Sequence, residues 1–192
     1  MKEISLRKIE MVKRKCSFFN FDKFCAEIEM RIQFEPKDEI VRFGEFSVWE
    51  DDLLFHYEMK RLLDMVKTIL KGEKRCLVLK DHKKWIADVK RGKKLYAFLK
   101  KHGISNRKTE GMILEPGTEW KEIQLLVKSV FQCNTNAIFI LPESKAVLIP
   151  TDHMDLFVYC ERIETMEKIG KNIMSGNLTS PPISQTNILI SR

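Results

Sequence analysis

The chain has little glycine and no long apolar run. It holds 8 glycines in 192 residues, below the roughly 7% of an average protein, and none of the glycine-rich loops that bind nucleotide phosphates. Its longest apolar stretches, such as residues 137–141, are far shorter than the about 20 residues that cross a membrane. Residues 1–15 are charged throughout and lack the apolar core of a signal peptide. We therefore expect an intracellular, cytoplasmic protein with no membrane-spanning helix.

Cysteine and histidine are too dispersed for a familiar site. The five cysteines have no CxxC spacing and their number is odd, which argues against a disulfide framework and a cysteine-based zinc site. None of the four histidines has a second ligand type at helical spacing in a metal motif. No serine or cysteine lies in a recognisable nucleophile motif. We expect free, mostly buried thiols and no cofactor.

What the chain does have is a basic middle. Residues 60–108 contain 17 Lys or Arg and 4 Asp or Glu, a net charge of +13. Residues 1–59 carry 10 basic and 13 acidic groups, and residues 109–192 carry 7 and 10, so each flank has a net charge of −3. Charge concentrated in this way attracts polyanions more strongly than the same charges scattered over a surface.

The middle segment therefore predicts a surface that binds nucleic acid or another polyanion. Tyr96 and Trp85 lie among its cations and would stack on bases if they are exposed. An acidic protein partner fits the same charge, so a protein-interaction module such as an adaptor or inhibitor stays open, as does a purely solvated lysine-rich surface. The candidate nucleic-acid-binding residues are Lys83, Lys84, Lys90, Arg91, Lys93, Lys94, Lys100 and Lys101, with Arg107 and Lys108 close by.

Periodicity predicts the helices. In residues 51–71 the apolar side chains from Phe55 to Leu70 recur at intervals of three and four, and Gly72 follows as a stop. Further helices are expected over residues 93–102, 118–132 and 163–173, whereas residues 4–12 fit either a helix or a strand.

Alternating or continuous apolar runs predict the strands. Single strands are expected at residues 26–34, 39–43, 46–49, 111–114 and 155–160, and hairpins join residues 75–79 to 85–89 and residues 137–141 to 146–149. The sum is an α+β (mixed α/β) fold with antiparallel hairpins and three to five helices. The change of charge suggests regions 1–108 and 109–176 with a flexible tail at 177–192, or one continuous domain.

A second reading of the basic middle is catalytic. Asp88 and Lys90 lie two apart on the expected strand 85–89, so both would point to one face. The arrangement resembles part of the motif of PD-(D/E)xK nucleases, although the Pro-Asp dipeptide of that family is missing. The resemblance implies that Asp88 and Lys90 are catalytic and that Glu58, Glu73 and Asp88 hold Mg²⁺ or Mn²⁺. An ion-paired couple on a strand surface is the alternative.

Four short runs followed by a helix mark the C-terminal region. They are GMI, WKEI, AIFI and AVLIP, which begin at residues 111, 120, 137 and 146. Over residues 110–175 this pattern resembles YcxB-like domains, bacterial modules with a pleckstrin-homology-type fold. The resemblance implies a module without enzymatic activity, and it would place at least part of residues 118–132 in a strand. Members usually carry transmembrane helices, and Thr151 stands where a basic residue is common.

Overall fold

The computed structural model describes residues 2–22, 25–26, 31–34, 53–81 and 83–175. Within these residues the chain forms five helices, which are α1 (Leu6–Lys15), α3 (Leu53–Ile69), α4 (Lys93–Lys101), α5 (Trp120–Phe131) and α6 (Ile163–Ser175). The helices expected over 51–71, 93–102, 118–132 and 163–173 are confirmed to within a few residues at each end. The ambiguous N-terminal stretch is the short strand β1 (Lys2–Glu3) followed by α1.

Seven strands form one antiparallel sheet in the order β1-β6-β5-β7-β8-β9-β4. A second, two-stranded sheet pairs β2 (Phe19–Asn20) with β3 (Cys25–Ala26). The remaining strands of the large sheet are β4 (Arg31–Phe34), β5 (Cys76–Lys80), β6 (Gly111–Leu114), β7 (Ala137–Leu141), β8 (Ala146–Pro150) and β9 (Leu156–Cys160). Antiparallel strands with covering helices confirm the α+β class.

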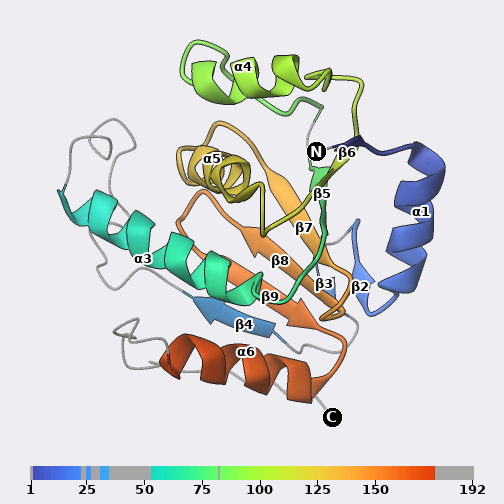
Figure 1. Ribbon diagram of the computed structural model, residues 1–192, viewed down its shortest axis with the longest axis vertical. Coiled ribbons are helices and arrows are strands. Elements are labelled where there is room, and N and C mark those ends of the chain that lie inside the picture. The colour runs from blue at the N-terminus through green and yellow to red at the C-terminus, as the bar shows by residue number, and fades with distance from the viewer. Residues whose placement is uncertain (1, 23–24, 27–30, 35–52, 82, 176–192) are drawn as a thin grey trace.

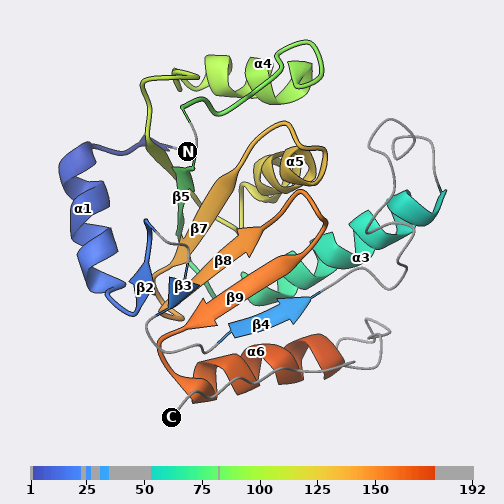
Figure 2. The same cartoon turned by 180° about the vertical axis from the view of Figure 1, so that it is seen from behind.

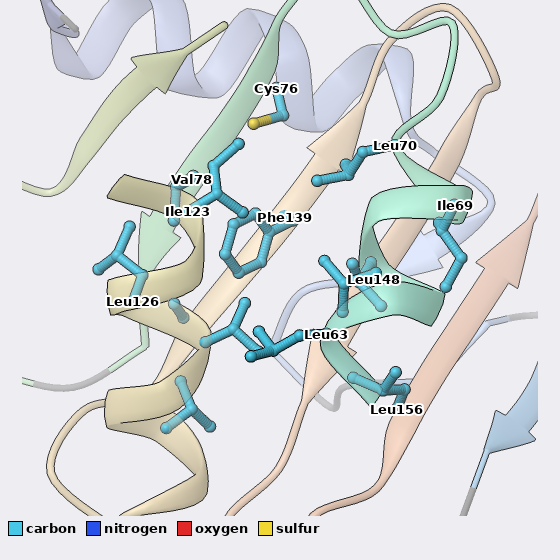
Figure 3. Close-up of a cluster of buried hydrophobic side chains, with 14 of the residues drawn as sticks. Leu63, Ile69, Leu70, Cys76, Val78, Ile123, Leu126, Phe139, Leu148 and Leu156 are labelled. Carbon is cyan, nitrogen blue, oxygen red and sulfur yellow. The ribbon is translucent and has the colours of Figure 1, made fainter. Parts of the chain in front are cut away.

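Helices α3, α5 and α6 cover one face of the sheet, and α1 with the β2–β3 pair lies against the other (Figures 1 and 2). Successive residues of a strand point to opposite faces, so Val78 of β5 belongs to the core on the face that the helices cover, while Leu77 belongs to the core on the face of α1. Figure 3 shows Val78, Phe139 and Leu148 from three neighbouring strands meeting side chains of α3 and α5. This layering explains why β7 is apolar throughout, since both of its faces are covered.

The expected hairpin between residues 75–79 and 85–89 is wrong in its second half. Residues 76–80 are a strand, but β5 pairs with β6 on one side and with β7 on the other. Residues 83–92 contain no strand. Of the apolar run at residues 85–89 that suggested one, Trp85 and Ile86 are fully buried as anchors of an irregular connection, whereas Val89 is exposed. The hairpin of β7 and β8 is confirmed.

The large sheet takes strands from both sides of residue 109. β5 comes from the first of the two expected regions, and its neighbours β6 and β7 come from the second. Residues 118–132, which the YcxB-like resemblance would place partly in a strand, contain the helix α5. Of the strand expected at 26–34, residues 31–34 are the strand β4 and Ala26 ends the strand β3, whereas residues 27–30 lie outside the described part of the chain. Residues 39–43, 46–49 and 177–192 lie outside the described part of the chain.

Candidate functional site

The candidate site is the connection between the neighbouring strands β5 and β6, residues 81–110, here named the basic connection. Helix α4 lies within it, packs beside α5 and occupies one end of the long axis of the molecule, opposite α6 (Figures 1 and 2). The basic connection contains ten basic and three acidic residues, a net charge of +7. All ten cations are exposed, and they are Lys83, Lys84, Lys90, Arg91, Lys93, Lys94, Lys100, Lys101, Arg107 and Lys108.

Little of this charge is neutralised within the fold. In the described part of the chain, none of the ten cations forms an ion pair with an acidic side chain. Glu110 instead pairs with Lys80 of β5 at 3.1 Å, and that lysine also donates to the carbonyl of Arg107 at 2.7 Å. The ten charges are therefore exposed and have no ion-pair partner in the described ranges, which favours attraction of a polyanion.

Trp85 anchors the first part of the basic connection. Its side chain is fully buried, and its indole N–H donates to the carbonyl of Thr109 at 2.8 Å. Its backbone N–H donates to the carbonyl of Asn106, and the next N–H, of Ile86, donates to the Asn106 side-chain oxygen at 2.8 Å. A buried indole with its N–H satisfied stabilises the segment around it. Trp85 therefore does not meet the condition of exposure under which it would stack on bases.

Asn134, in the turn between α5 and β7, anchors the second part. The oxygen of this buried side chain accepts a hydrogen bond from the N–H of Asp88 at 2.9 Å. The backbone carbonyl of Asn134 accepts a second one from the N–H of Ala87, also at 2.9 Å. Gly92 lies so close that a Cβ there would clash with the Asn134 amide nitrogen and come within 2.9 Å of Ile86. Sequence reasoning missed both asparagine anchors, because an asparagine in a polar turn gives no sign of what it binds.

Helix α4 presents the cations in a defined order. Leu95 and Leu99 are buried against the core, which leaves the opposite side of the helix to Lys93, Lys94, Lys100 and Lys101. The first turn contains no acidic residue, and the N-cap is Gly92, which has no side chain to cap the helix. Two lysines at the positive end of the helix dipole are unfavourable for the helix, by about 0.3–1 kcal/mol each at a surface. Their position is thus poorly explained by the stability of α4.

The residues of the nuclease alternative have separate structural surroundings. The Asp88 carboxylate accepts hydrogen bonds from the backbone N–H groups of Lys90 at 2.8 Å and Arg91 at 3.5 Å. These bonds close a turn, so Asp88 does not lie on a strand as expected. Glu58 is buried on α3 and pairs with Arg61 at 2.8 Å. No group of three or more His, Cys, Asp or Glu among the described residues could hold a metal ion. Glu58, Glu73 and Asp88 are therefore not brought together.

Glu73 is used by the turn between β7 and β8. Its carboxylate accepts hydrogen bonds from the N–H of Glu143 at 3.1 Å and of Ser144 at 2.8 Å, and from the Ser144 hydroxyl. Burial, with a smaller contribution from the neighbouring Glu143 carboxyl, raises the pKa of Glu73 to about 7. The role that this geometry gives Glu73 is to join the end of the α3 segment to the hairpin.

The thiols offer no reactive centre among the described residues. Cys16, Cys76, Cys133 and Cys160 are free, as expected, and the side chain of Cys25 lies outside the described set. Burial raises the pKa of Cys16 to about 11 and of Cys133 to about 12. Such thiols are protonated at neutral pH and are poor nucleophiles.

Comparisons with protein-family models, with curated proteins and with solved structures find no match for this chain. Among the described residues, no helix is both long enough and apolar enough to cross a membrane.

Proposed function

We propose that the basic connection binds nucleic acid through its phosphate backbone. The observation that carries this proposal is the exposure of ten basic side chains, none of them ion-paired among the described residues, on one connection of the sheet. That connection is held in place by the hydrogen bond that the Trp85 indole donates and by those that the Asn106 and Asn134 side chains accept. Cations on a pre-organised support bind a polyanion at a lower entropic cost than cations on a loose tail.

The choice of cations suggests which part of the nucleic acid is contacted. Eight of the ten are lysines and two are arginines. A lysine ammonium binds phosphate as a point charge without strong directional demands, whereas specific base contacts rely more on arginine. We therefore expect binding that is independent of sequence and falls steeply with salt, by about 0.7–0.9 log units per contacted phosphate for each log unit of salt.

Reversing the charge of the first turn of α4 tests the proposal. The double variant Lys93→Glu, Lys94→Glu places carboxylates at the positive end of the helix dipole, so α4 should become slightly more stable. Affinity for a labelled oligonucleotide, measured by fluorescence anisotropy over a series of salt concentrations, should fall by at least about tenfold, and the salt dependence should become shallower by about two phosphates. Because the fold is not weakened, a loss of binding reports on the contact itself.

The matched control is Lys168→Glu, Lys171→Glu on α6, at the far end of the molecule (Figure 1). Both lysine pairs are exposed, and each double substitution by itself lowers the net charge of the chain from +7 to +3. The control should keep most of the affinity if the site is the basic connection. Equal losses in the two variants would mean that only net charge matters. The proposal would be rejected if the affinity for the oligonucleotide changed neither with salt nor in the two double variants. It would also be rejected if the protein bound an acidic protein stably and had no affinity for nucleic acid.

A further inference from the structure

We infer that the ligand of the basic connection is single-stranded nucleic acid, with Tyr96 as the residue on which a base stacks. This inference rests on the proposed function and deepens it. Tyr96 is 39% exposed although it lies on a helix whose neighbouring residues Leu95 and Leu99 are fully buried. Trp85 is buried, so the two aromatic residues singled out in the basic middle of the sequence have opposite surroundings.

The Tyr96 side chain has no polar, ring or cation partner among the described residues. Its backbone N–H donates to the carbonyl of Gly92 to close the first turn of α4, but its side chain takes part in no hydrogen bond, ring contact or cation contact there. The partly buried Phe98, in contrast, packs against the core and lies 5.1 Å from the ring of His102. An exposed aromatic ring without an internal partner is available to a ligand.

Cations flank this ring on its own helix. Lys93 precedes Tyr96 by three residues and Lys100 follows it by four, which are the spacings that place side chains next to each other on a helix. The two lysines are about 10 Å apart along the helix axis, from a rise of about 1.5 Å per residue. The two lysines therefore belong to the helical turns before and after Tyr96, and their long side chains can reach the phosphates that precede and follow a base stacked on its ring.

This arrangement favours a single strand over a duplex. In a duplex the bases are stacked on one another and paired, so an exposed ring between phosphate-binding cations finds no free base face. In a single strand the bases can turn out, and stacking of one base on an aromatic side chain contributes roughly 5- to 150-fold in affinity. Removal of Tyr96 should therefore weaken binding of a single strand and leave binding of a duplex nearly unchanged.

The test compares four proteins on four probes by fluorescence anisotropy at one salt concentration. The proteins are the wild type, Tyr96→Ala, Tyr96→Phe and Tyr57→Ala, the last being a control because Tyr57 is a 53% exposed tyrosine on α3. The probes are an unstructured single strand, in DNA and RNA forms, a duplex of the same sequence, and a strand of equal length without bases. Tyr96→Ala should lose roughly 5- to 150-fold in affinity for the single strand alone, while Tyr96→Phe and Tyr57→Ala bind it like the wild type.

The outcomes separate this inference from the function on which it rests. Equal binding of the single strand by the wild type and Tyr96→Ala, together with loss of binding in Lys93→Glu, Lys94→Glu, would overturn the stacking role and leave nucleic-acid binding in place. The stacking role would also be overturned if Tyr96→Ala lost as much affinity for the strand without bases as for the single strand, because no base is present in that probe. Insensitivity to the lysine changes would overturn the proposed function itself.

Discussion

At the scale of single residues, Glu73 joins two parts of the chain that are 70 positions apart. Its carboxylate receives the N–H groups of Glu143 and Ser144 at the tip of the β7–β8 hairpin. The backbone donors favour the charged form, but burial and the nearby Glu143 carboxyl outweigh them, and the pKa rises to about 7. The protein therefore carries a carboxylic acid that titrates near neutral pH for a structural reason.

This position predicts a pH-dependent stability. The folded protein holds the Glu73 proton up to about pH 7, whereas the unfolded chain releases it near pH 4.5. Because the folded state binds more protons in that window, this group makes the free energy of unfolding fall as pH rises from 4.5 to 7. Denaturant titrations at several pH values should show Glu73→Gln gaining stability relative to the wild type across the window.

Glu167→Gln, on the exposed side of α6, is the control for loss of a negative charge. A stability difference between Glu73→Gln and the wild type that stays constant from pH 4.5 to pH 7 would contradict the assignment.

At the scale of elements, the basic connection depends on two asparagines and a tight approach at Gly92. The close neighbours of Gly92 are the Asn134 amide, Ile86 and the carbonyl of Asp88, which lies 3.3 Å from the position of a Cβ. Since Gly92 also precedes the first residue of α4, the direction in which the helix leaves the connection is coupled to this packing. An added methyl group would have to displace the Asn134 side chain that holds Asp88.

We predict that Gly92→Ala lowers the free energy of unfolding by about 1–3 kcal/mol, the usual cost of overpacking. Hydrogen exchange should quicken at the Ala87 and Asp88 amides, which donate to Asn134. Gly117→Ala is the matched control because nothing lies within 4 Å of a Cβ there. If the two variants were equally stable, the packing at Gly92 would not be needed.

At the scale of the whole molecule, strand order ties the two expected regions together. β5 has β6 and β7 as its neighbours, and both follow residue 109 in the chain. Helix α3 packs beside α5 and α6, which also come later. A fragment of residues 1–108 would leave both edges of β5 unpaired and expose apolar side chains such as Val78 and Leu62.

We therefore predict that residues 1–108 alone do not fold, whereas the full chain unfolds in one cooperative transition. Circular dichroism on heating and the dispersion of an amide NMR spectrum would distinguish the two. A fragment with a dispersed spectrum and a sharp thermal transition would show that the first region is an independent domain.

Local periodicity predicted most of the secondary structure because it indicates which side of a helix or strand is buried. The residues from Phe55 to Leu70 predicted α3, and the apolar run of residues 137–141 predicted β7. The same reasoning failed at residues 85–89, where Trp85 and Ile86 are buried for a different reason. A short apolar run does not distinguish a strand from the anchored part of a connection.

The sequence by itself determined the α+β class, the positions of the helices and the concentration of basic residues between β5 and β6. Only the tertiary structure decided that β5 pairs with β6 and β7, that Glu58, Glu73 and Asp88 form no three-ligand metal site, and that Tyr96 is exposed while Trp85 is buried. The physical reason is that periodicity is a property of neighbouring residues. Strand pairing and burial depend instead on contacts between segments far apart in the chain, whose free energies no local pattern records.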